Sequence, residues 1–297
     1  MRLFLLTVLV LQFPIAAAST LVPKWLVELP DSVSEVLIAS AESAALYRYE
    51  NNGHGIVQKD SRYMSIGRNG VGKVRAWDRK TPLGVYFITE ELNTDRLHDK
   101  YGDAAFVLDY PNALDRFHRR TGDGIWLHGV DRNEPERPPL DTDGCLALPN
   151  EEITRIAADL EPLVTPVIVA RELAFATPEE LAATRREFRQ ALNRWQQSID
   201  DADVAAYLAL YADDFRLQEM AKDDWATWRA NVFAARGPVT TELRDVVLLA
   251  DPEERDMYLS RFTRVLHLDG REVTTRKRLY WRRNGASDWQ ILTEDNG

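Results

Sequence analysis

Between residues 36 and 170 the chain shows short apolar or alternating runs of the length of β-strands. Val36 to Ala39 is apolar and residues 44–50 alternate, and the turn residues Asn51-Asn52-Gly53 follow, which predicts a hairpin. Further runs of this kind predict strands at residues 63–67, 83–90, 105–110, 125–128 and 167–170. This part of the chain is therefore expected to be rich in strands and turns.

One loop and one helix interrupt these strands. Residues 129–144 contain three prolines and several Asp and Asn residues, so they are expected to form a loop. Beyond Pro149-Asn150, apolar residues recur at i, i+3, i+4 and i+7 from Ile153 to Leu160, which predicts a helix.

From Thr177 onward the pattern is helical first and strand-like afterwards. Thr177 is a suitable N-cap and Pro178 suits the first helical position, so a long helix is expected to begin there. The later runs predict a second helix around residues 204–211 and strands at residues 242–250, 257–268, 271–282 and 289–292. Helices followed by an antiparallel sheet predict an α+β domain of about 120 residues.

Residues 1–18 differ from the rest of the chain. Arg2 precedes an apolar run that begins at Leu3, and Ala16-Ala17-Ala18 offers a cleavage site. The run is short for a membrane span, so it predicts a secretory signal peptide and a periplasmic or otherwise exported protein, with a retained N-terminal anchor as the alternative. No later run has the length of a transmembrane helix. We expect a signal peptide (1–18), a lead-in (19–35), a first domain (36–172) and a second domain (173–297).

The charge and the cysteine and histidine content exclude two classes of ligand. The formal net charge is −10, so the net field of the protein does not favour nucleic acid. Only one cysteine is present, and no HExxH or comparable histidine pair occurs, so neither a metal site nor a cofactor is expected.

The single cysteine, Cys145, carries more information. Cysteines of exported proteins normally form disulfide pairs, so a lone thiol is expected to pair between chains, to be buried and inert, or to do chemistry. His128 ends a predicted strand and Cys145 lies beside another, so both side chains are placed at strand ends. A nearby histidine would be the base that activates the thiol, and its second ring nitrogen would need an acceptor.

The residues around this pair resemble a known active-site signature. His128-Gly129 and Thr142-x-Gly144-Cys145, with sixteen residues between His128 and Cys145, are similar to the signature of the YkuD-type L,D-transpeptidases. The segment Thr81-Pro82-Leu83-Gly84-Val85-Tyr86 resembles the TPxGxF/Y strand of that family. The resemblance runs from Val36 to Ala170 and implies a β-rich catalytic domain.

The resemblance also implies roles for individual residues. Cys145 would be the nucleophile that forms a thioester, and His128 would be its base, oriented by the carbonyl of Gly129. Backbone N–H groups at Gly144 and Cys145 would hold the oxyanion. Substrate contacts are expected from three further side chains: Thr142, Trp126 and Arg137. The substrate would be a peptidoglycan stem peptide, attacked at the bond between the L-centre of its diamino acid and a D-residue.

One departure from the family leaves the reaction open. The common version has an arginine two residues after the cysteine, where this chain has Ala147. This favours trimming, as an L,D-carboxypeptidase or a hydrolase that releases wall-linked protein, over cross-linking as an L,D-transpeptidase. A non-catalytic wall-binding scaffold is a further alternative.

Residues 178–297 resemble the SnoaL-like cone fold, which is related to nuclear transport factor 2. The resemblance rests on Trp195, on Tyr207 and Tyr211 ahead of Asp213-Asp214-Phe215, and on Trp281 and Trp289. We expect an accessory binding module or one that forms a homodimer, with the main activity in this domain as an alternative. Three polar residues could be site residues but better fit turns and the sheet surface: Asp213, Asp214 and His267.

Overall fold

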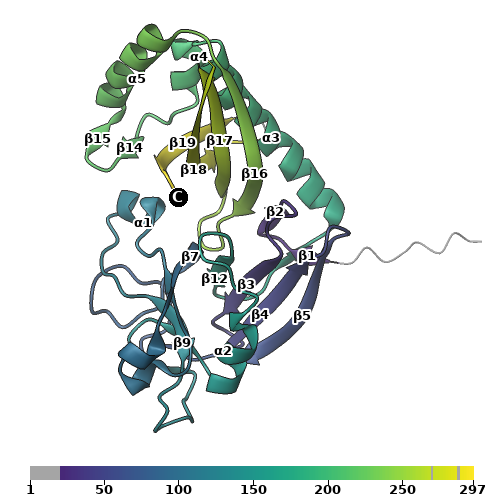
Figure 1. Ribbon diagram of the computed structural model, residues 1–297, viewed down its shortest axis with the longest axis vertical. Helices are drawn as coiled ribbons and strands as arrows, with labels where there is room; N and C mark the ends of the chain where they lie inside the picture. The colour runs from purple at the N-terminus through teal and green to yellow at the C-terminus, as the bar shows by residue number, and fades with distance from the viewer. Residues whose placement is uncertain (1–20, 269, 286–287) are drawn as a thin grey trace, which may run out of the picture.

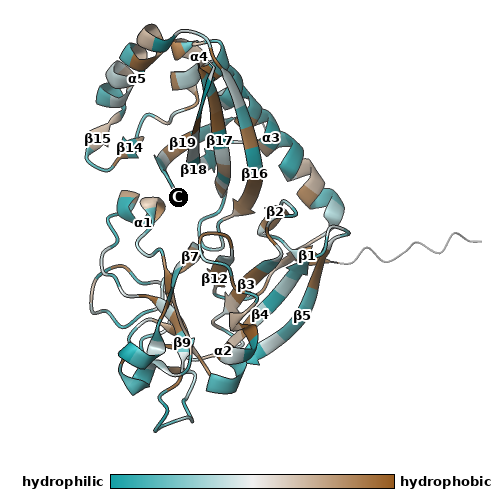
Figure 2. Ribbon diagram, in the orientation of Figure 1, coloured by the Kyte–Doolittle hydropathy of each residue, from teal (hydrophilic) through white to brown (hydrophobic). Residues whose placement is uncertain are grey.

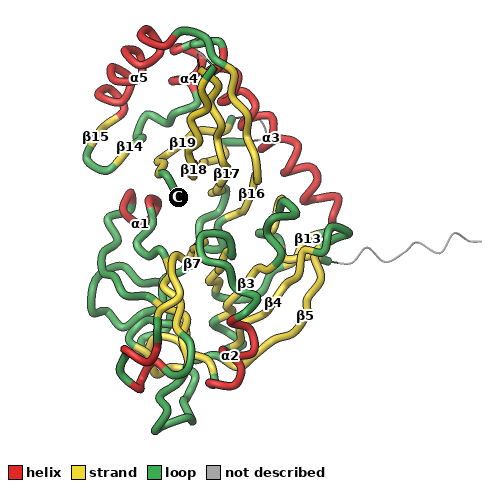
Figure 3. Tube along the Cα trace, in the orientation of Figure 1, coloured by secondary structure: helices red, strands yellow, loops and turns green. Residues whose placement is uncertain are grey.

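A computed structural model describes residues 21–268, 270–285 and 288–297 (Figure 1). The predicted signal peptide at residues 1–18 lies outside these described residues. Two sheets are stacked one above the other, and Figure 3 shows most of the helices gathered around the upper sheet. Within the described ranges, no helix combines the length and the apolar character that a membrane crossing requires.

The lower sheet has eight strands in the order β11-β9-β8-β7-β12-β3-β4-β5. Its neighbours are antiparallel, except that β9 with β11 and β3 with β12 are parallel. The strands are β3 (Glu35–Ser40), β4 (Ala45–Asn51), β5 (Ile56–Tyr63), β7 (Gly84–Leu92), β8 (Ala105–Leu108), β9 (Trp126–Gly129), β11 (Leu146–Leu148) and β12 (Pro166–Ala170). The short helices are α1 (Ala113–Phe117), α2 (Asn150–Ala157) and two 3-10 turns, η1 (Thr94–Arg96) and η2 (Asp99–Tyr101).

The predicted hairpin, the later strands and the helix at Asn150 are confirmed, and two details are wrong. The run at 63–67 is divided between β5 and a short strand, β6 (Ile66–Gly67). β5 gave little signal because it is an edge strand with mostly exposed polar residues. The expected loop at 129–144 includes β10 (Leu140–Thr142), which pairs with β6 in a separate parallel pair.

The upper sheet has five strands in the order β19-β18-β17-β16-β2. Its elements are β16 (Thr240–Ala250), β17 (Met257–Leu268), β18 (Arg271–Arg283), β19 (Trp289–Asp295), α3 (Pro178–Asp200), α4 (Val204–Ala209), α5 (Lys222–Arg236) and the short pair β14 (Arg216–Leu217) and β15 (Met220–Ala221). Thr177 caps α3 as predicted, and its hydroxyl accepts from the Glu180 N–H. The sequence pattern did not predict α5, because Arg229 lies at the centre of its buried face, between Trp225 and Phe233, and interrupts the apolar pattern.

The described part of the lead-in, from residue 21, contributes one strand to the upper sheet. β2 (Leu26–Glu28) pairs antiparallel with β16, and β1 (Val22–Pro23) pairs with β13 (Phe175–Ala176) ahead of α3. Arg185 of α3 donates to the Val27 carbonyl at 2.9 Å. The polypeptide therefore enters through the upper sheet before it forms the lower one.

Both faces of the lower sheet are buried. On β3, Leu37 and Ala39 face a core that α2 closes, whereas Val36 and Ile38 face a second core. This second core is shared with the upper sheet, and Figure 2 shows apolar strands on both sides of the junction. Its members from the upper sheet include Val247, Leu249, Met257, Leu259, Tyr280 and Leu292.

A buried ion pair crosses the junction beside this shared core. Arg278 of β18 contacts the carboxylate of Asp109, which follows β8, and also donates to Asp295 at 2.6 and 2.7 Å. Asp109 accepts in addition from the Phe87 N–H at 2.8 Å. Burial raises the pKa of Asp109, and the guanidinium of Arg278 opposes that rise.

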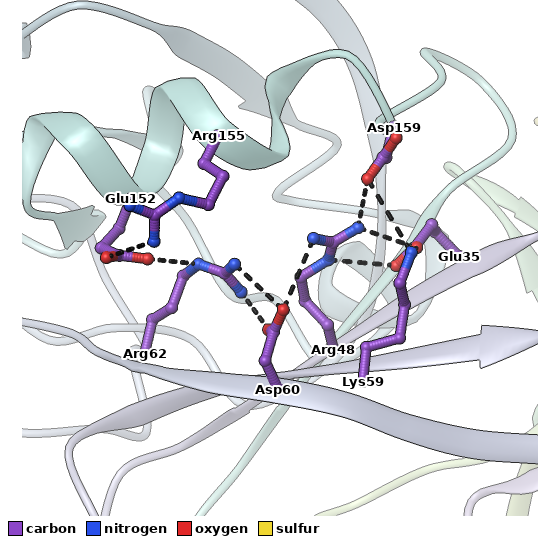
Figure 4. A network of polar contacts seen from close by, with 8 residues as sticks. All are labelled: Glu35, Arg48, Lys59, Asp60, Arg62, Glu152, Arg155 and Asp159. Atoms are coloured by element: carbon purple, nitrogen blue, oxygen red, sulfur yellow. Dashed lines mark hydrogen bonds and ion pairs between the residues drawn. The ribbon is translucent and has the colours of Figure 1, made fainter.

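A second charge network fastens α2 to the outer strands of the lower sheet (Figure 4). Arg62 of β5 contacts Glu152 of α2 at 2.7 Å, and Arg48 of β4 contacts Asp159, just after α2, at 2.5 Å. Arg48 also pairs with the buried Glu35 at 2.8 Å. The first residue of α2 therefore has a fixed position relative to the sheet, which matters for the site.

Replacing Arg278 by methionine should destabilise the protein by about 3 kcal/mol, because it leaves the buried Asp109 carboxylate without its partner. Arg282→Met on the same strand is the matched control, since Arg282 pairs with the exposed Asp214. The Arg282→Met change should lower the free energy of unfolding by less than about 1 kcal/mol. Denaturant unfolding of the full chain measures both, and equal losses would show that the buried pair has no special weight.

Candidate active site

Two neighbouring parallel strands position the predicted nucleophile and base. β11 pairs with β9 so that Leu146 lies beside Leu127 and Ala147 beside His128. Leu127 and Leu146 belong to the core, and side chains alternate along a strand, so His128 projects from the opposite face. Cys145 directly precedes β11, and its sulfur accepts from the backbone N–H of Trp126 at 3.4 Å. Strand register therefore brings Cys145 and His128 together.

The hydrogen bond of His128 determines which ring nitrogen can act as the base. Nδ1 lies 2.6 Å from the carbonyl oxygen of Gly129. A carbonyl accepts only, so Nδ1 carries the proton and Nε2 keeps its lone pair. The imidazole is buried and meets the Tyr101 ring edge-on at 5.3 Å. This is the hydrogen bond to the Gly129 carbonyl that the resemblance in sequence implied for His128.

Thr142 organises the turn that carries the nucleophile. Its hydroxyl accepts from the Gly144 N–H at 3.1 Å and donates to the Cys145 carbonyl at 2.8 Å. Gly144 has a φ of 135°, and a Cβ there would lie 2.8 Å from the Lys80 carbonyl oxygen, so glycine is required. The Gly144 N–H is thus engaged and does not serve as a free oxyanion donor. The Cys145 N–H has no hydrogen-bond partner among the described residues.

Burial disfavours the charged forms of Cys145 and His128. It raises the pKa of the Cys145 thiol to about 11, against the opposing effect of the Trp126 N–H. It lowers the pKa of His128 to about 4, against the opposing effect of the Gly129 carbonyl. Desolvation disfavours the charged form of each group, so the thiol and the imidazole are both favoured in their neutral forms.

A pocket of about 600 Å³ opens at the pair, and Cys145, His128, Thr142 and Arg137 all line it. The other expected site residues, Trp126, Gly129 and Gly144, do not line it and act through backbone groups or packing. The pocket walls also hold Arg68, Arg79 and Lys100, and the carboxylates of Asp123, Asp141 and Asp143. Arg137 and Lys100 both depress the pKa of His128 and of Cys145, so these two cations act on the reacting groups.

Sequence reasoning missed the residues that cover and orient His128. Tyr101 of η2 lies between His128 and Trp126, whose ring centroid is 4.5 Å away. Asn150, the first residue of α2, accepts from the Asp103 N–H and donates to the Val130 carbonyl, so it joins the end of β9 to the turn after η2. The helical pattern revealed Asn150 as a helix start, but no local signal connected η2 with the site.

The remaining polar candidates lie elsewhere. In the upper sheet and its turns, three candidates make surface ion pairs: Asp213 with Lys222, Asp214 with Arg282, and His267 with Glu272. Within the described part of the chain, no group of three or more His, Cys, Asp or Glu side chains is placed to hold a metal ion.

The raised thiol pKa predicts how Cys145 reacts without substrate. A thiol of raised pKa stays protonated at neutral pH, so alkylation by iodoacetamide should keep accelerating above pH 9. The same chain in denaturant is the control, because its thiol should titrate near 8.5. Cys145 is the only cysteine, so total label reports this site alone. A rate that is already maximal below pH 7 would instead show a preformed thiolate.

Comparison with known proteins places this geometry in a family. Residues 34–169 match the family model of the L,D-transpeptidase catalytic domain, YkuD, and residues 187–295 match that of the Cds6 C-terminal NTF2-like domain. A search of curated protein sequences found no match.

Two solved structures share the arrangement of both domains. Bd1075 from Bdellovibrio bacteriovorus is 23% identical with a TM-score of 0.76, over 93% of this chain and 98% of that chain. The helical cell shape determining protein Pgp2 from Campylobacter jejuni is 22% identical with a TM-score of 0.76, over 88% of this chain and 91% of that chain. Because both structures are less than 25% identical in sequence to this chain, their similarity shows the fold alone. The two family-model matches identify the domains. Residues 34–169 thus form a YkuD-type L,D-transpeptidase catalytic domain, and residues 187–295 form an NTF2-like domain.

Proposed function

We propose that this protein is an exported cysteine acyl-transfer enzyme that trims peptidoglycan stem peptides, as an L,D-carboxypeptidase. The observation that carries the proposal is that Cys145 and His128, held by adjacent strands, line one pocket, while the hydrogen bond of Nδ1 leaves Nε2 of His128 as the proton acceptor. The YkuD match supports a substrate in the cell wall, and the expected signal peptide at residues 1–18 supports export.

The proposed reaction proceeds in two halves. Cys145 Sγ attacks the carbonyl carbon at the L-centre of the diamino acid while His128 Nε2 takes the thiol proton. The Cys145 N–H, which is unengaged, faces the developing oxyanion. The C–N bond then breaks, His128 gives its proton to the leaving D-residue amine, and a thioester remains. Water attacks the thioester with His128 again as base, which releases the trimmed peptide and restores the thiol.

The surroundings of His128 support water as the acyl acceptor. Ala147 lies beside His128 in the strand register, where the common family sequence would place an arginine. Its small buried side chain brings no cation to that position. Transpeptidation would follow the same thioester with an amine as the acceptor, and release of wall-linked protein would differ only in the leaving group.

The upper domain supports an accessory role. The Arg229 guanidinium is buried and lies 4.5 to 5.5 Å from the rings of Tyr207, Trp225, Trp228 and Phe233. Its Nε and Nη2 atoms have no hydrogen-bond partner among the described residues. A buried, unpaired cation of this kind favours a binding module, and a homodimer through this domain stays a prediction. By analogy with Pgp2, we further propose that trimming by this protein affects cell shape.

Mass spectrometry of muropeptides incubated with the mature protein tests the reaction. The wild type should convert tetrapeptides to tripeptides, and Cys145→Ala should abolish the conversion because no thioester forms. His128→Asn should lower the rate by a factor of about 100 to 10,000, the usual contribution of a positioned base.

The product pattern also separates the alternatives. New peptide dimers would contradict trimming and show transpeptidation, and a released wall-linked protein would show an amide hydrolase. If the wild type left the muropeptide profile unchanged, the result would favour a non-catalytic wall-binding scaffold. Arg244→Gln is the matched control, since Arg244 makes an exposed ion pair with Glu242 in the upper sheet, outside the pocket.

A further inference from the structure

The most exposed large apolar side chain at the catalytic pocket is that of Trp77. It is 93% exposed, yet it lines the same pocket as Cys145. Its φ of 63° places it in the left-handed region, and Arg79 has a φ of 56°. Such backbone costs about 1–2 kcal/mol for a residue other than glycine, and it persists where the surroundings enforce it.

The surroundings of Trp77 do enforce this conformation. The Asp78 carboxylate accepts from the N–H groups of Val74, Arg75 and Lys80 at 2.8 to 3.1 Å and from Lys73 Nζ at 2.9 Å. Although burial alone would raise it, these hydrogen bonds lower the pKa of Asp78 to about 2. The loop at residues 73–80 is therefore wound around one carboxylate and holds Trp77 in a fixed place.

The same loop is joined to the segment beside the nucleophile. Thr121 donates its N–H to the Val74 carbonyl at 3.0 Å, and its hydroxyl accepts from the Ala76 N–H at 3.2 Å. Gly122 allows this approach, since a Cβ there would lie 3.1 Å from Cε of Lys73. Two residues on, the Gly124 carbonyl accepts from the Cys145 thiol at 3.4 Å. The backbone that carries Trp77 is thus positioned relative to the Cys145 sulfur.

We propose that Trp77 is a platform for the glycan of peptidoglycan, and that its indole packs against the amino sugar to which the stem peptide is attached. The inference rests on the proposed function, because Trp77 shares the pocket of Cys145 and so contacts whatever is bound there. Stem peptides of alanine, glutamate and a diamino acid offer no large apolar side chain to an indole. A sugar ring presents a flat face of C–H groups, which suits an aromatic surface.

The far side of the platform also suits a glycan. Trp77 borders a second hollow of about 560 Å³, whose polar lining includes Asn69, Arg75 and Lys80. These are donors for the hydroxyl and N-acetyl groups of a neighbouring sugar. A glycan strand that passes Trp77 would therefore find an apolar face on the indole and polar partners beyond it.

Calorimetric binding to the Cys145→Ala protein tests this inference without turnover. The two ligands are a disaccharide-tetrapeptide muropeptide and the same tetrapeptide without sugar. We expect the disaccharide form to bind about tenfold more tightly, and an added Trp77→Ala change to reduce that ratio to about one. Trp77→Phe should keep part of the preference. Phe175→Ala is the control, an exposed aromatic residue outside the catalytic pocket, and it should leave the ratio unchanged.

Three results would overturn the inference. The Cys145→Ala protein could bind both ligands equally well, or the ratio of the two affinities could be unchanged by Trp77→Ala. Trp77→Ala could also weaken binding of both ligands equally, which would place the peptide on Trp77. Thermal unfolding of each variant shows whether it is folded, and Trp77→Phe keeps the test decisive if the alanine variant is not. Binding to the Cys145→Ala protein requires no reaction. The affinity ratio therefore tests the role of Trp77 even if the mass-spectrometric assay shows no trimming.

Discussion

The burial of both faces of the eight-stranded sheet is the constraint on which the rest of the structure depends. An open sheet has two apolar faces to cover, and here α2 closes one and the upper sheet closes the other. Val36, Ile38 and Ile168, on central strands, would meet water without the upper domain. The NTF2-like domain is therefore part of the catalytic fold. Removing residues 178–297 would test the stability of the lower sheet as much as its catalytic independence.

The strand register of this sheet determines where the candidate site residues lie. Parallel pairing of β9 with β11 fixes the height of Cys145 relative to His128, and a shift of one residue would turn one side chain into the core. Two hydrogen bonds then complete the orientation, from Thr142 to the turn and from His128 to the Gly129 carbonyl. The charge network around Arg48 and Arg62 holds α2. Through it, distant strands fix the position of Asn150, which joins the end of β9 to the turn after η2.

Local pattern predicted most elements and suggested Cys145 and His128 as candidate site residues, and it failed where distant contacts decide the structure. The helix cap at Thr177 and the signature around Cys145 are local, so they were readable. α5 was missed because Arg229 lies at a buried position that the apolar pattern requires to be apolar. Tyr101 and β2 were missed because their partners are far away in the sequence. The charge state of Cys145 depends on burial, which no spacing of residues reveals.

That charge state would suit the proposed exported enzyme with its single thiol. A thiolate is the form that reacts with oxidants and disulfides, so a resting site with a permanent thiolate would be open to damage. In this structure the Cys145 thiol donates to the Gly124 carbonyl and His128 stays neutral. In the proposed reaction, thiolate formation would require the carbonyl of a bound peptide, because the developing oxyanion at the Cys145 N–H and the proton on His128 would offset the loss of the thiol proton. The burial that raises the thiol pKa therefore ties reactivity to occupation of the pocket.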